Sequence, residues 1–254
     1  MRADASRQSE DAALGGRLRL RQLRQGHRFG HDAILLAAAC PGRAGERAVE
    51  LGAGVGAAGL ALAARVEGIA VTLVELDARL AALARENVEL NGLAARVEVA
   101  NLDAAASARV FAAAGLAPQS QNRVLMNPPF NDPVRQRASP DPRRRSAHVG
   151  AHGALSAWMR TAARLLRPSG TLTVIWRAQG LREVLDALAP GFGGASVLPI
   201  HSKEGQPALR VIVRAVKGSR AALSLLPGFV LNDAAGRPTA EAESVLRDAA
   251  TLQM

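Results

Sequence analysis

The sequence has one cysteine, no tyrosine and only two lysines among its 254 residues. A single cysteine, Cys40, excludes a disulfide framework and a zinc site built on a cysteine cluster. No apolar run approaches the roughly 18 residues that a membrane span needs, and the first residues lack the apolar segment of a secretory signal. We therefore expect a cytoplasmic protein with neither a membrane segment nor a metal site.

Arginine carries nearly all of the positive charge, because lysine supplies only two of the cations behind the net charge of +10. Clustered cations neutralise phosphates, so this excess favours a nucleic-acid partner. The arginine- and alanine-rich composition that a GC-rich genome produces explains the same total without any function. The positions of the arginines, rather than their number, must decide between these two explanations.

The chain divides into a tail, a short basic segment and a long core, and we expect one domain over residues 17–254. Residues 1–16 are small and polar, which predicts a disordered tail. Residues 17–46 begin with alternating arginine and leucine, the period of a basic strand or hairpin with one charged face. An apolar helix follows, with Asp32 as its expected N-cap and Pro41-Gly42 at its end.

From residue 47 onward, short apolar runs alternate with helical segments. We expect strands over residues 47–54, 70–77, 96–103, 123–130 and 170–178, with helices over 57–66, 78–92, 154–170 and 181–189. This alternation predicts a parallel sheet with helices on both faces. Residues 195–202 and 207–218 are two further strands joined by a short loop, so they must pair antiparallel. The prediction is an α/β fold with a mostly parallel seven-stranded sheet and an antiparallel last strand.

A glycine-rich loop follows the first of these strands, over Glu50-Leu51-Gly52-Ala53-Gly54-Val55-Gly56. Glycines let the backbone turn sharply and approach a ligand closely, while the next helix offers free N–H groups. Gly54 to Gly59 formally match the dinucleotide motif G-x-G-x-x-G. The register with an acidic residue ahead of the first glycine is more typical of an S-adenosylmethionine loop. Both nucleoside cofactors remain open at this point.

Acidic residues end the next two strands. Glu75, followed by Leu76, is placed to accept hydrogen bonds from the two hydroxyl groups of a ribose, which suits either cofactor. Asp103 lies at the rim where an adenine ring is expected. The loop and these residues together predict a nucleoside site at the carboxyl edge of the sheet.

The tetrapeptide Asn127-Pro128-Pro129-Phe130 follows the fourth strand at the same edge. Two prolines fix an extended backbone, so the Asn127 side chain and the Pro128 carbonyl present two acceptors to one NH₂ group, and Phe130 can stack on a planar base. An exocyclic aromatic amine is a poor nucleophile because its lone pair is delocalised. Two acceptors on its hydrogens favour a tetrahedral amine and stabilise the positive charge that develops during attack. This arrangement indicates methylation of a planar NH₂ group.

Residues 14–254 resemble the small-domain methyltransferases related to bacterial tRNA1(Val) adenine-N6 methyltransferase. The resemblance rests on residues 23–38, 50–56, 74–77, 127–130 and 208–218. It implies the Rossmann-like class I methyltransferase fold, and a target amine held by Asn127, Pro128, Pro129 and Phe130. It also implies S-adenosylmethionine as the cofactor, with contacts from Arg28, Phe29, Asp32, Glu50, Gly52, Ala53, Gly54, Gly56, Glu75, Leu76, Asp103 and Asn127.

Two basic clusters flank the expected site in the sequence. They are Arg17, Arg19 and Arg21 before the glycine loop, and Arg143, Arg144, Arg145 and His148 after Phe130. This placement favours a polyanionic substrate such as tRNA, in which a loop adenine is easily extruded into a pocket. The sequence does not distinguish between a monomer and a homodimer.

The leading hypothesis is S-adenosylmethionine-dependent methylation of the N6 amine of an RNA adenine, in tRNA near the anticodon. The main alternative is a protein glutamine N5-methyltransferase acting on a release factor, which also grips a planar NH₂ group. Such enzymes carry a helical N-terminal domain, whereas fewer than fifty basic, strand-like residues precede Glu50 here. An NAD-dependent oxidoreductase leaves the tetrapeptide unexplained. An RNA-binding module without activity would not depend on Asn127.

Overall fold

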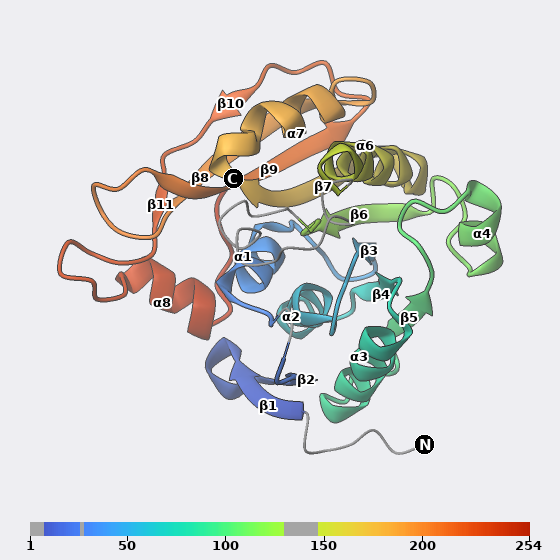
Figure 1. Cartoon of the computed structure of the whole chain (residues 1–254), viewed down its shortest axis with the longest axis horizontal. Coiled ribbons are helices and arrows are strands. Elements are labelled where there is room, and N and C mark those ends of the chain that lie inside the picture. Colours follow the sequence, from blue (N-terminus) through green and yellow to red (C-terminus); the bar gives the residue numbers. More distant parts are fainter. Residues whose placement is uncertain (1–7, 26–27, 130–146) are drawn as a thin grey trace.

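A mostly parallel sheet forms the centre of the protein in a computed structural model that describes residues 8–25, 28–129 and 147–254 (Figure 1). Its long strands lie in the order β8-β9-β7-β6-β3-β4-β5, and β9 is antiparallel to both β7 and β8. These seven strands are β3 (Arg47–Leu51), β4 (Ala70–Glu75), β5 (Val97–Asn101), β6 (Gln121–Met126), β7 (Leu166–Arg177), β8 (Phe192–His201) and β9 (Ala208–Lys217). The predicted sheet and its antiparallel last strand are confirmed.

Two strands of two residues each, β10 (Ser224–Leu225) and β11 (Phe229–Val230), extend the sheet beside β8. The sequence predicted neither, because a pair of residues carries no periodicity. Both run parallel to β8.

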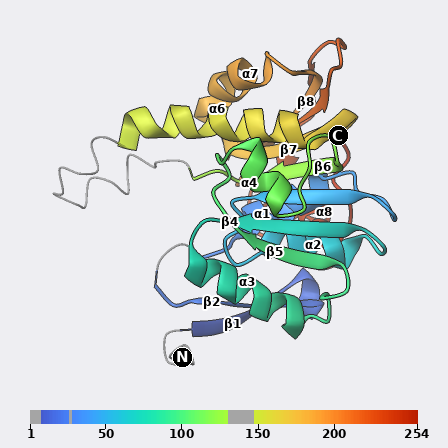
Figure 2. The ribbon, with the colours of Figure 1, turned by 90° about the vertical axis from the view of Figure 1, so that its right-hand side faces the viewer.

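Helices cover both faces of the sheet, which is why its strands are nearly continuous apolar runs. One face packs against α1 (His31–Ala39), α2 (Ala57–Arg65), α3 (Ala78–Leu90) and α8 (Ala240–Arg247). The other packs against α4 (Ala108–Ala113), α6 (Ala147–Leu165) and α7 (Leu181–Leu188). Figure 2 shows α6 and α7 on one side of the sheet and α3 on the other. The helices α4 and α8 were not predicted, and α6 begins earlier than expected.

Residues 8–16 correct the expected disordered tail. Gln8–Ala13 form β1, which pairs antiparallel with β2 (Leu18–Leu23) through a turn at Leu14–Gly16. The reason is burial, since Leu14, Leu18 and Leu20 pack into the core of the α1 and α2 face and β1 completes the hairpin against them. The polar residues of β1 gave no apolar alternation by which to predict a strand.

The parallel strands β3 to β6 end at one edge of the sheet, where the loops that follow them meet. The main-chain N–H groups of Gly52 and Ala53 donate to the Val74 carbonyl, which joins the glycine loop to the end of β4. Leu51 pairs with Met126 in the register of β3 and β6, so the glycine loop and Asn127 leave neighbouring strands at the same level. Ligands of doubly wound folds bind at this edge.

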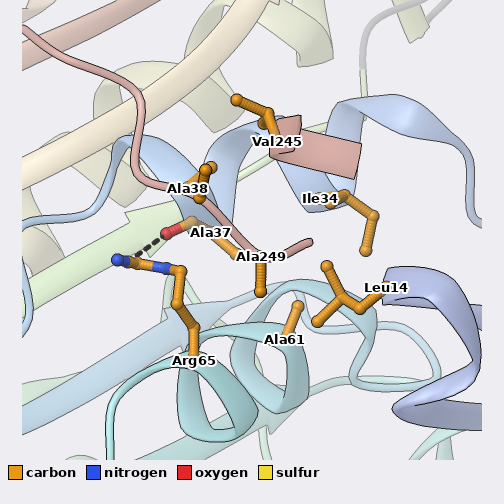
Figure 3. Close-up of a pocket in the computed structure, with 9 residues that line it drawn as sticks. Leu14, Ile34, Ala37, Ala38, Ala61, Arg65, Val245 and Ala249 are labelled. Atoms are coloured by element: carbon orange, nitrogen blue, oxygen red, sulfur yellow. Dashed lines mark hydrogen bonds between the residues drawn. The ribbon is translucent and has the colours of Figure 1, made fainter. Parts of the chain in front are cut away.

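A shallow apolar seam lies well away from that edge, between α1, α2 and α8 (Figure 3). Its lining includes Leu14, Ile34, Ala61 and Val245, and it has no room for a water molecule. Arg65 closes it by donating to the carbonyl oxygens of Ala37 and Cys40 at 2.6 and 2.7 Å. This seam is a packing contact between helices and not a ligand site.

Candidate functional site

The glycine loop turns away from the sheet through backbone conformations that favour glycine. Gly52, Gly54 and Gly56 have φ angles of +71°, +58° and +88°. A Cβ atom on Gly52 would lie 2.3 Å from the Trp158 ring of α6, so the small residue there serves packing. A Cβ atom on Gly54 would meet no atom within 4 Å. The loop is therefore open at Gly54, which lets a ligand approach its backbone.

Glu75 lies at the end of β4 and is only 9% exposed. Two backbone N–H groups hold its carboxylate in place. One carboxylate oxygen accepts from the Gly54 N–H at 2.7 Å, and the other accepts from the Asp77 N–H at 2.8 Å. Each oxygen keeps a second lone pair for another donor. Two oxygens fixed in this way match the two neighbouring hydroxyl groups of a ribose.

Leu76 and Asp103 extend this edge beyond Glu75. The Leu76 side chain is 66% exposed, which gives an apolar surface for a flat base beside the carboxylate. Asp103 is exposed, and its carboxylate accepts from the Ala105 N–H at 2.8 Å. Asn101, which the sequence reasoning missed, donates to the carbonyl oxygens of Glu75 and Leu76 at 2.8 and 2.9 Å. The only sign of this role in the sequence is an amide side chain at the end of a strand.

Glu50 lies inside the core rather than at the open side of the loop. Its side chain is buried, and one oxygen accepts from the Gly59 N–H at 2.6 Å. Burial raises the pKa of Glu50 to about 8, although the Gly59 hydrogen bond opposes this. In this position Glu50 fixes the first turn of α2 against the end of β3.

The residues after β6 leave the sheet beside the glycine loop. Asn127 is half-buried, Pro128 is buried and Pro129 is exposed, whereas Phe130 lies outside the described residues. Among the described residues, none forms a hydrogen bond with the Asn127 side chain. Asn127 thus leaves β6 at the edge where Glu75 and Gly54 also lie.

The segment before α1 is anchored to the N-terminal hairpin. The Arg28 guanidinium donates to Ser9 at 3.1 Å and to Asp11 at 2.9 Å, and the Phe29 N–H donates to Gln22 at 3.1 Å. These contacts orient Arg28 toward the hairpin. The Phe29 side chain packs against the core of the α1 and α2 face.

Asp32 does not cap α1, which corrects the expectation from its sequence position. The helix begins at His31, Gly30 occupies the N-cap position, and no side chain caps it. The Asp32 carboxylate accepts from Arg210 at 2.9 Å instead, and thereby joins the first turn of α1 to the start of β9. An ion pair at the helix terminus has replaced a local cap.

Known proteins that are similar to this chain are methyltransferases, which agrees with the geometry of the site. The family model of the methyltransferase small domain matches residues 28–203. The chain belongs to this family. A tRNA1(Val) (adenine(37)-N6)-methyltransferase from Erwinia tasmaniensis is 31% identical over 208 residues, which are 81% of this chain and 78% of that protein. One from Bacteroides fragilis is 27% identical over 73% of this chain and 76% of that protein.

Solved structures give the same fold. A predicted O-methyltransferase from Agrobacterium tumefaciens is 32% identical with a TM-score of 0.74, over 87% of this chain and 98% of that chain. An S-adenosylmethionine-dependent O-methyltransferase from Thermotoga maritima is 18% identical with a TM-score of 0.53, over 78% of this chain and 69% of that one, and shows the fold alone. This methyltransferase therefore has the class I fold that its sequence predicted.

The cofactor of this methyltransferase is S-adenosylmethionine, which supplies an electrophilic methyl group on a sulfonium. The described residues fit it. Gly54 leaves open space, Glu75 presents two fixed oxygens, and Leu76 offers an apolar surface. The sulfonium is already activated, so the residues have to orient the reacting groups rather than generate a strong base.

The first basic cluster is largely paired within the methyltransferase. Arg19 and Arg21 share the Glu10 carboxylate, and Arg21 also lies 3.7 Å from Glu86. Arg17 donates to the Asp248 carbonyl. In the second cluster, Arg143, Arg144 and Arg145 lie outside the described residues, and His148 falls in the first turn of α6. Carboxylates of the same chain therefore offset more of the positive charge of the hairpin than its sequence indicated.

None of the helices in residues 28–129 or 147–254 is both long and apolar enough to cross a bilayer.

Proposed function

We propose that the protein transfers a methyl group to the exocyclic N6 amine of an adenine in RNA, in a tRNA near the anticodon. The observation that carries this proposal is the position of Asn127 and Pro128, one strand away from the glycine loop and on the same edge as Glu75. The names of the relatives from Erwinia and Bacteroides agree with it. Such a substrate belongs in the cytoplasm.

The side chain of Asn127 and the carbonyl of Pro128 would each accept a hydrogen from the target NH₂ group. Their pull favours a tetrahedral nitrogen whose lone pair points at the methyl carbon. The new N–C bond then forms as the C–S bond breaks with its electron pair left on sulfur, and the nitrogen afterwards loses one proton to solvent. Phe130 is the expected stacking partner of the adenine ring. Pro129 keeps the backbone between them extended.

Product analysis tests this proposal directly. The purified protein and S-adenosylmethionine with a deuterated methyl group are incubated with total RNA from a strain in which the gene is deleted. The RNA is digested and analysed by mass spectrometry, and nuclease mapping locates the label. We expect labelled N6-methyladenosine in the tRNA fraction. Label on a ribose oxygen, or on a glutamine of an added release factor, would contradict the proposal.

Asn127→Ala separates target binding from cofactor binding. Because Asn127 would act on the amine in the transition state, we expect kcat to fall by about 100-fold. The dissociation constant of S-adenosylhomocysteine, measured by calorimetry, should rise far less than kcat falls, by about fivefold at most, since Asn127 is one of several expected cofactor contacts and Glu75 and Gly54 remain. An unchanged kcat would remove Asn127 from the catalytic site.

A further inference from the structure

Asn87 of α3 and Asn91, the C-cap residue of that helix, bind the outer edge of the N-terminal hairpin as a neighbouring strand would. Asn91 accepts from the Arg19 N–H at 2.9 Å and donates to the Arg19 carbonyl at 2.7 Å. Asn87, one helical turn earlier, accepts from the Arg21 N–H at 2.7 Å and donates to the Arg21 carbonyl at 2.9 Å. Residues four apart share one face of a helix, and alternate residues of β2 share one edge, so the two spacings match.

Asn87 differs from Asn91 in one contact that reaches the cofactor site. Its amide also donates to the Val55 carbonyl at 3.0 Å, and Val55 lies between Gly54 and Gly56 in the glycine loop. The Asn87 side chain is fully buried. A single amide therefore connects the backbone of the hairpin with the backbone of the loop.

The same hairpin also bonds to the segment before α1. Gln22 follows Arg21 and is buried, and its oxygen accepts from the Phe29 N–H. Its amide donates to Asp11 at 2.7 Å, and Asp11 in turn pairs with Arg28. The Gln22 hydrogen bond and the nearby Arg28 hold the pKa of Asp11 below its usual value. Thus one hairpin contacts both the glycine loop and the segment before α1.

We infer that the hairpin positions the cofactor site, with Asn87 as the residue that couples hairpin docking to the glycine loop. Loss of Asn87 would leave buried backbone groups of Val55 and Arg21 without partners, so the loop would relax away from its binding geometry. Because coupling between two equilibria is reciprocal, cofactor binding would in turn hold the hairpin in place. The residue acts on the ligand through the loop and not by contact.

Asn91 supplies a matched control, because it makes the same two bonds to β2, while its third bond goes to the Asn87 carbonyl at 2.7 Å and not to the glycine loop. We expect both Asn87→Ala and Asn91→Ala to lower the thermal midpoint of the full-length protein. Asn87→Ala should also raise the dissociation constant of S-adenosylhomocysteine by about tenfold or more, whereas Asn91→Ala should change it by less than about twofold. Equal affinities in the two variants would overturn the inference.

Hydrogen exchange of the wild-type protein gives a second test that survives if Asn87→Ala does not fold. The N–H groups of Arg19 and Arg21 are both bonded to α3 amides, so they report hairpin docking. Addition of saturating S-adenosylhomocysteine should slow their exchange. Unchanged exchange at both positions would show that the hairpin and the cofactor site are independent. Neither measurement requires an RNA substrate, so failure of the proposed RNA specificity leaves both readable.

Discussion

Glu50 and Glu75 are both buried, and they bind different parts of the turn that leads from β3 into α2. Glu75 accepts from Gly54 at the rim, whereas Glu50 accepts from Gly59 inside the core. Burial raises the pKa of Glu50 to about 8, so its neutral form is favoured at neutral pH. One glutamate thus fixes the start of α2, and the other remains available to a ligand.

The pH dependence of stability should report this burial. The pKa of Glu50 rises from 4.5 to about 8 on folding, so between these values the folded protein holds one more proton than the unfolded chain. The stability that Glu50 contributes is fully present below its unfolded pKa and is lost as the pH rises toward 8. Glu50→Gln keeps an acceptor for Gly59 and removes the titration.

Scanning calorimetry of the cofactor-free protein between pH 5.5 and 8.5 measures this effect. The thermal midpoint of Glu50→Gln relative to wild type should increase with pH, by about 3 °C or more over this range. Glu98→Gln, at an exposed position of β5, is the control. Parallel pH curves for wild type and Glu50→Gln would show that Glu50 does not titrate there.

At the scale of elements, the glycine loop combines positive φ angles, which glycine adopts without strain, with open space beside its backbone. Alanine at a positive φ costs about 1 kcal/mol wherever it occurs. Gly54 and Gly92 have φ angles of +58° and +66°, and a Cβ atom on either would meet nothing within 4 Å. Gly92 follows α3, about 20 Å from the end of that helix at which Glu75 lies. The two glycines differ mainly in their distance from the cofactor site.

Gly54→Ala and Gly92→Ala should therefore separate strain from ligand binding. Both variants should lose a similar few degrees of thermal midpoint. Only Gly54→Ala should weaken the binding of S-adenosylhomocysteine, by about tenfold or more. The added methyl group would enter the space through which the cofactor approaches the backbone of the loop. If the two variants bind the ligand equally well, the open side of Gly54 is not part of the site.

Local patterns were sufficient to predict most elements but not the contacts between distant ones. The strands β3, β4 and β6 are short, mainly apolar runs, of which β3 ends at the glycine loop, β4 at Glu75 and β6 before Asn127-Pro128. The strand β1 has no such pattern. It forms because it pairs with β2 and because Arg19 and Arg21 of β2 bind its Glu10 carboxylate. The roles of Asn87 and Gln22 depend on partners far away in the sequence, and an amide in a helix or strand gives no local signal of that kind. The position of Asp32 predicted a cap, but Arg210 offered a stronger partner.

At the scale of the whole molecule, the net charge of +10 is unevenly available to a polyanion. Carboxylates of Glu10, Asp11 and Glu86 oppose the arginines of the hairpin. The second cluster, Arg143 to Arg145, begins 13 positions after Phe130, the last residue of the tetrapeptide that is expected to hold the target base. If the proposed RNA substrate is correct, this second cluster should contribute more of the binding free energy.

Binding of tRNA at different salt concentrations can compare the two clusters. Replacement of Arg143, Arg144 and Arg145 by Gln should weaken binding and reduce the slope of log affinity against log salt by about 2 to 3. Replacement of Arg19 and Arg21 by Gln should reduce the slope by less than about 1, because those side chains already face Glu10. A larger effect from the hairpin pair would reverse the assignment of the RNA-facing surface.

The long separation between β2 and α3 has a consequence for the order in which the protein is made. Arg21 leaves the ribosome 66 residues before Asn87, which corresponds to roughly 3 to 13 seconds of synthesis. An isolated hairpin is marginally stable, and the outer edge of β2 is without its α3 partners during that interval. Arg19 and Arg21 put two positive charges beside that edge against the single carboxylate of Glu10, and charged edges resist pairing with another nascent chain. The arginines of the hairpin thus have a use during translation that is separate from any RNA substrate.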